Sequence, residues 1–142
     1  MPPSETFDDF KSKQPGFVAN WTETNTGSAG STATATKAAS ANNTHFLCGL
    51  IVACKETTSS SNPPTVTCNV KDGTTPGTGI SFGFTAGSND DYDTNGGPVV
   101  INFGAPIQFT EGNAITVELT GASMQQTSSV SFWGFTSSIR VN

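Results

Sequence analysis

The chain has 142 residues, which is enough for one domain with its own hydrophobic core. Only 12% of the residues are charged and the formal net charge is −5, so the chain lacks the basic surface that nucleic-acid binding requires. No apolar run approaches the roughly 20 residues that span a bilayer. We therefore expect neither nucleic acid nor a membrane as a partner.

The first 20 residues are predicted to form an N-terminal arm in front of a single domain that comprises residues 21–142. Three prolines in the arm discourage regular structure. The segment is polar and acidic and lacks the pattern of a signal peptide, so we expect synthesis in a cytoplasm. Aromatic side chains are the candidate anchors of such an arm, because they bury well in a partner's grooves. These residues are Phe7, Phe10, Phe17 and Trp21.

Eight segments after residue 30 have the composition or the alternation of β-strands and are separated by turn residues. In 44–56 both faces are apolar, and simple alternation places Phe46 and Leu50 on one face and Leu47 on the other. Gly104 and Ala105 are expected to divide two further strands. No window has a helical period, so we predict an all-β, antiparallel sandwich of about eight strands, with a jelly roll favoured. The predicted strands are 32–40, 44–56, 65–71, 79–84, 98–103, 106–109, 114–120 and 129–141.

The sequence contains no arrangement typical of an enzyme. His45 is the single histidine and begins a strand, where a hydrogen-bonded structural role is the usual one. Most carboxylates lie in the arm or in turns, and no pair is placed for glycoside hydrolysis. Cys48 and Cys54 are too far apart along one strand for a disulfide, and the spacing of the three cysteines does not fit zinc. We therefore predict no catalytic residues and buried thiols.

One acidic loop has the beginning of a calcium-binding pattern. Asp91, Asp93 and Asn95 are two apart and Gly96 follows, as in the first half of an EF-hand loop. The twelfth position is Asn102 instead of a bidentate Glu, and strands flank the loop, so it is not an EF-hand. A solvated turn is the favoured interpretation, and no cofactor is expected. A structural calcium ion at Asp91, Asp93 and Asn95 is the alternative.

Residues 32–136 resemble the small jelly-roll virion proteins of tailed bacteriophages, which decorate or cement the capsid or form small appendages. The order and spacing of several short motifs, and not any one of them, carry this resemblance over about three quarters of the chain. The long acidic loop at 86–97 and the arm depart from the usual pattern. The matching motifs are Ala35-Thr36-Lys37-Ala38-Ala39, Thr44-His45-Phe46 through Gly49, Val70-Lys71-Asp72-Gly73-Thr74, Pro106-Ile107, Glu111-Gly112-Asn113-Ala114 before Ile115, and Val130-x-Phe132-Trp133-Gly134-Phe135.

The resemblance implies a homotrimer on the capsid surface, at threefold or quasi-threefold positions, that binds neighbouring major capsid subunits and stabilises the head. The apolar segments at 44–54 and 130–135 offer more apolar surface than one small sandwich needs, and a threefold interface would bury the excess. The alternative is a carbohydrate- or receptor-binding β-sandwich of a fibre or appendage, with Trp133 and Phe135 as its stacking face. Candidate trimer or packing residues are Phe46, Leu50, Phe132, Trp133 and Phe135.

Overall fold

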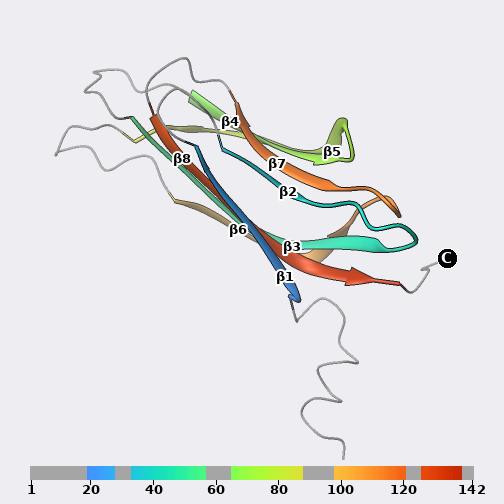
Figure 1. The fold of residues 1–142 in the computed structure, drawn as a ribbon. Coiled ribbons are helices and arrows are strands. Elements are labelled where there is room, and N and C mark those ends of the chain that lie inside the picture. Colours follow the sequence, from blue (N-terminus) through green and yellow to red (C-terminus); the bar gives the residue numbers. More distant parts are fainter. Residues whose placement is uncertain (1–18, 28–32, 57–64, 88–97, 121–125, 139–142) are drawn as a thin grey trace, which may run out of the picture.

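A computed structural model describes residues 19–27, 33–56, 65–87, 98–120 and 126–138, and these ranges contain eight strands and no helix. Consequently no described helix is long and apolar enough to cross a membrane. Figure 1 shows the strands as two layers. They are β1 (Trp21–Gly27), β2 (Thr34–Lys37), β3 (Thr44–Glu56), β4 (Thr65–Asp72), β5 (Thr75–Thr85), β6 (Val99–Gln108), β7 (Ile115–Thr120) and β8 (Gln126–Ser137).

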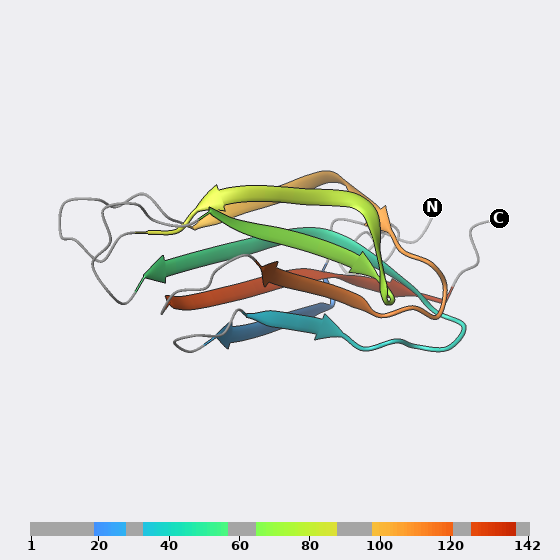
Figure 2. The same cartoon turned by 90° about the horizontal axis from the view of Figure 1, so that it is seen from above.

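The strand order is that of a jelly roll. One sheet has the order β1-β8-β3-β6 and the other β2-β7-β4-β5, and every pairing within them is antiparallel. Successive strands therefore alternate between the two sheets, except for β4 and β5, which form a hairpin within one sheet, as in a jelly roll. Viewed along the layers, β1 and β2 lie at one edge of the sandwich and β5 and β6 at the other (Figure 2). The predicted all-β sandwich of about eight strands is confirmed.

The core fills the space between the two sheets with alternate residues of the central strands. In β7, for example, Ile115, Val117 and Leu119 are fully buried, and the residues between them face outward. Phe132 of β8 is the largest completely buried side chain of its strand. Other buried apolar residues are Leu47, Leu50, Val52, Cys54, Val66, Cys68, Val70, Phe109 and Val130.

A β-bulge in β3 overturns the predicted facing of its first half. The pairing of β3 with both neighbours shifts between Leu47 and Gly49, so Cys48 is an extra residue. As a result Leu47 points inward together with Leu50, whereas Phe46 lies on the outer face. The simple alternation placed Phe46 and Leu50 on one face, and it was wrong because one added residue inverts the phase of everything before it.

The expected break at Gly104 and Ala105 is an irregularity inside one strand. β6 runs from Val99 to Gln108, but its pairing partners on β3 change from Asn102 opposite Gly49 to Ile107 opposite Leu47. The residues between Asn102 and Ile107 therefore lie opposite the β3 bulge. Pro106 is tolerated there because β6 is an edge strand, where an unpaired backbone nitrogen costs little.

Polar contacts join the two sheets at the β1–β2 edge. The Lys37 ammonium lies 3.5 Å from a Glu23 carboxylate oxygen, and the Asn25 side-chain amide donates to the Thr34 carbonyl at 2.6 Å. Lys37 also lies 5.4 Å from the centre of a ring of Trp21, which packs inside this edge. These contacts place charged and amide groups along two edge strands, a common protection against unwanted strand pairing.

A single carboxylate, that of Asp72, holds two turns together. It accepts hydrogen bonds from the Thr110 backbone N–H (3.0 Å), the Thr110 hydroxyl (2.7 Å) and the Asn113 amide (2.9 Å). Burial raises the pKa of Asp72, but the hydrogen bonds from Asn113 and Thr110 outweigh it and leave the pKa below the ordinary value of 3.8. Gly73 follows with φ of 66°, where a side chain would be strained, and its N–H donates to the Ala114 carbonyl.

Candidate binding surface

The outer face of the β1-β8-β3-β6 sheet carries a group of large apolar side chains, which we call the aromatic face. Strand pairing aligns them: Phe46 is opposite Phe135, and Ile51 is opposite Val100. Val100 is 53% exposed, the highest value for a large apolar side chain among the described residues, and most of the others are partly buried. The aromatic face comprises Phe46, Ile51, Val100, Trp133 and Phe135.

Phe46 and Phe135 form a stacked pair on this face. Their ring centres are 4.6 Å apart and their planes differ by 4°. The stack covers Phe135, which is only 9% exposed, while Phe46 stays more accessible. Such a pair contributes about 0.5–1.5 kcal/mol beyond the area it buries, so it gives the face one rigid aromatic block.

Trp133 packs directly onto a glycine of the neighbouring strand. A Cβ added at Gly49 would collide with the Trp133 indole and would also lie 2.8 Å from the Ile101 carbonyl oxygen. The absence of a side chain at Gly49 thus lets the indole lie against the backbone of β3, next to the bulge at Cys48. The indole is held by this contact and remains partly exposed.

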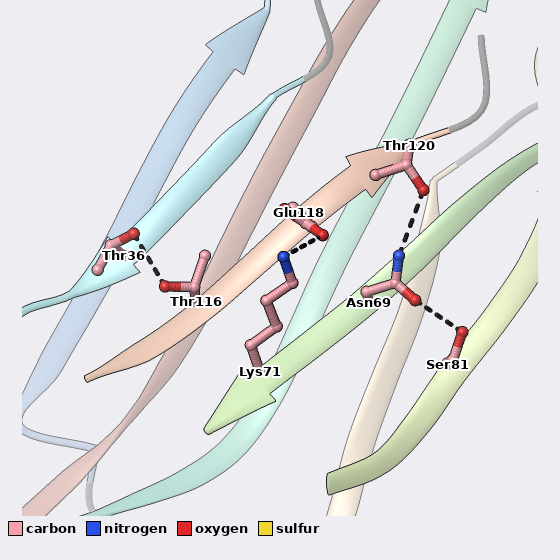
Figure 3. A network of polar contacts seen from close by, with 7 residues as sticks. All are labelled: Thr36, Asn69, Lys71, Ser81, Thr116, Glu118 and Thr120. Carbon is pink, nitrogen blue, oxygen red and sulfur yellow. Dashed lines mark hydrogen bonds and ion pairs between the residues drawn. The ribbon is translucent and has the colours of Figure 1, made fainter. Parts of the chain in front are cut away.

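The outer face of the other sheet is polar and has its own hydrogen-bond network (Figure 3). Lys71 and Glu118 form an ion pair at 2.6 Å, and Thr36 and Thr116 share a hydrogen bond at 3.2 Å. Asn69 extends the network, because its amide donates to the Thr120 hydroxyl and its carbonyl accepts from the Ser81 hydroxyl. These side chains satisfy one another across four strands, so this face suits contact with water and contrasts with the aromatic face.

Two of the five predicted trimer or packing residues lie in the core. Leu50 and Phe132 have no exposed surface and point between the sheets, so they cannot form a contact between subunits. The remaining three, Phe46, Trp133 and Phe135, are brought together on the aromatic face. Sequence reasoning omitted Ile51 and Val100 from that group, although their apolar character in a strand was a visible signal.

The structure places Trp21 in β1 and not in a free arm. Its ring contacts Phe132 at 5.7 Å and His45 at 6.1 Å between ring centres, both edge to face. The indole also lies against Gly134, where a Cβ would come within 2.6 Å of the ring. Trp21 is therefore part of the sandwich. The other predicted anchors, Phe7, Phe10 and Phe17, lie outside the described residues.

Two ionisable residues, His45 and Glu56, are buried in the interior. His45 is buried, and its Nε2 donates to the Ala38 carbonyl at 2.9 Å while Nδ1 contacts the Thr136 hydroxyl at 2.7 Å, so both ring nitrogens are used. Glu56 is 1% exposed, and its carboxylate has no hydrogen-bond partner in the described part of the chain. Within those same ranges, no three His, Cys, Asp or Glu residues gather as metal ligands would. The predicted calcium ligands Asp91, Asp93 and Asn95 lie outside them.

The thiols are suited to packing and not to nucleophilic chemistry. Burial raises the pKa of Cys48 and brings that of Cys68 to about 12, and burial followed by the nearby Glu56 charge raises the pKa of Cys54 to about 11. A thiol with a raised pKa is protonated at neutral pH, and the thiolate is the reactive form. None of the three forms a disulfide, as the sequence predicted.

Comparison with known proteins adds no relative to this description. No protein-family model, no curated protein and no solved structure matches the chain.

Proposed function

We propose that the chain is a non-enzymatic structural protein of a virion: a cement or decoration protein that trimerises at threefold or quasi-threefold positions of an icosahedral head. In this proposal it binds major capsid subunits from the outside of the shell, after synthesis in the host cytoplasm, and stabilises the head. The support is the ordered set of motifs that resembles small phage virion proteins, together with the jelly-roll order of the strands.

The observation that carries the proposal is the contrast between the two outer faces. On the outer face of one sheet, polar side chains around Lys71, Glu118 and Asn69 bond to one another, and the other sheet presents the aromatic face. A soluble domain gains nothing from a rigid apolar face unless another surface covers it, and interfaces draw most of their energy from such aromatic anchors. A protein that binds one partner through one sheet and faces solvent with the other has this asymmetry.

The proposal is tested by comparing matched substitutions on the two faces. Trp133→Ser on the aromatic face is expected to abolish binding to shells that lack the decoration protein, with little loss of thermal stability because the indole is partly exposed. Thr116→Ser on the polar face is the control and is expected to leave shell binding unchanged. Co-sedimentation with the shells reports binding, and light scattering reports the trimer. Undiminished shell binding by Trp133→Ser would contradict the proposal.

A carbohydrate- or receptor-binding module is the second candidate, and the placement of Trp133 favours it. An indole held against Gly49 and partly exposed resembles the stacking platforms on which sugars bind. This candidate predicts saturable binding of a glycan that is lost in Trp133→Ala. Absence of binding on a broad glycan array would remove it.

A further inference from the structure

The aromatic face begins where the N-terminal segment leaves the sandwich. The Asn20 N–H donates to the Gly134 carbonyl at 2.8 Å, which continues the β1–β8 pairing one residue beyond Trp21. The next residue of β8 is Phe135, whose ring stacks on Phe46 at the near end of the face. The described part of the chain therefore begins beside the stacked pair.

The length of this segment matches the length of the face. From the Phe46 row to the exposed Lys55, the face extends over nine residues of β3, or about 30 Å. Eighteen extended residues reach up to about 60 Å, so a chain leaving at residue 18 can cover the whole face. The segment contains three phenylalanines, and it is too short to bury them in a core of its own.

The charges of the N-terminal segment and of the aromatic face are also complementary. Among the described residues, Lys55 carries the one formal charge on the outer face of this sheet. It lies at the far end of the aromatic face. A segment that runs along the face from residue 18 reaches Asp8 and Asp9 after about nine or ten residues, or roughly 30 Å, which brings these acidic residues to Lys55. In such an arrangement Phe17 would be next to the stacked pair.

We propose that residues 1–18 of the same chain cover the aromatic face in the free protein, with Phe17 against Phe46 and Phe135 and with Asp8 and Asp9 near Lys55. This inference rests on the proposed function, because it concerns the same surface. It adds a way in which capsid binding is regulated. A capsid that binds the face must displace the segment, which is then available for the shell. The cover keeps an apolar surface from associating before it meets its partner.

The test uses the full chain free in solution, so its result does not depend on any capsid. Trp21→Phe leaves Trp133 as the only tryptophan, and Phe7→Ser, Phe10→Ser and Phe17→Ser are then added together. We expect the Trp133 emission to shift to longer wavelength and its acrylamide quenching to rise. Ser4→Ala with Gln14→Ala is the control in the same segment and should change neither. Equal emission and quenching with and without the three phenylalanines would overturn the inference.

Two further results separate the remaining explanations. If Trp133 becomes exposed on dilution of the unsubstituted full-length protein, a second copy covers the face and the inference is wrong. Protection that persists at nanomolar concentration and is lost only in the serine variant supports the chain's own segment. If Trp21→Phe fails to fold, hydroxyl-radical labelling of Phe46 and Trp133 in a chain that keeps Trp21 gives the same comparison: labelling must rise in the serine variant, and unchanged labelling would overturn the inference.

Discussion

Gly134→Ala tests the packing that joins β1, β8 and β3. An added Cβ at Gly134 would collide with the Phe46 carbonyl oxygen and would lie 2.6 Å from the Trp21 indole. The carbonyl belongs to the backbone of a central strand and cannot move away as a flexible side chain would. Overpacking of this kind costs typically 1–3 kcal/mol, and sometimes more, whereas replacing glycine stabilises by at most about 1 kcal/mol through the unfolded state. We expect a net loss of about 2 kcal/mol.

For a chain of this size, that loss corresponds to a fall in melting temperature of about 6–8 °C, measured by differential scanning fluorimetry and checked by urea unfolding. Gly104→Ala is the matched control, because a Cβ at Gly104 meets nothing within 4 Å and its φ is not positive. The control is expected to melt at or slightly above the temperature of the unsubstituted protein. Equal melting temperatures for the two alanine variants would refute the packing of Trp21 over Gly134.

Three further predictions concern the carboxylates. Since the hydrogen bonds to Asp72 lower its pKa in the fold, its contribution to stability is present above the unfolded pKa, near 4, and is lost as the pH falls through the lower folded value. Asp72→Asn should therefore melt below the unsubstituted protein at pH 7 and approach it below pH 3 in a pH series of melting curves; a constant difference would contradict this. Glu56→Leu should raise the free energy of unfolding in urea by about 1 kcal/mol, because it removes a buried carboxylate without a described partner; a loss of stability would show that the carboxylate has one. A chelator should leave the melting curve unchanged. A fall that calcium reverses would show that a structural ion binds, and Asp91, Asp93 and Asn95 are its predicted ligands.

The sequence predicts the class of the fold but not the division into strands. Alternation in β4 and β7 is clean because one face of each strand is buried and the other is polar, so Val66 and Ile115 could be assigned inward correctly. β1 was missed, although Thr22, Thr24 and Thr26 alternate in it, because its inward positions hold Trp21, Glu23 and Asn25 in place of aliphatic residues. The strand count still agreed, since β6 had been divided in two.

The aromatic face was predictable only in part. Trp133 and Phe135 share one face of β8 by simple alternation, as the sequence indicates. Phe46 joins them only because the bulge at Cys48 inverts the first half of β3, and nothing local in the sequence marks that bulge. Leu50 and Phe132 were as apolar as the surface residues, and their burial follows from how the two sheets pack, which a pattern within one strand does not contain.

The central proposal is that the aromatic face of the sandwich binds neighbouring major capsid subunits on a symmetric shell. Co-sedimentation of the full chain with shells that lack the decoration protein, at micromolar concentration, tests it most directly. The account predicts that the unsubstituted chain binds these shells and that Trp133→Ser stays in the supernatant. Failure of the unsubstituted chain to bind, or equal binding by Trp133→Ser, would contradict it.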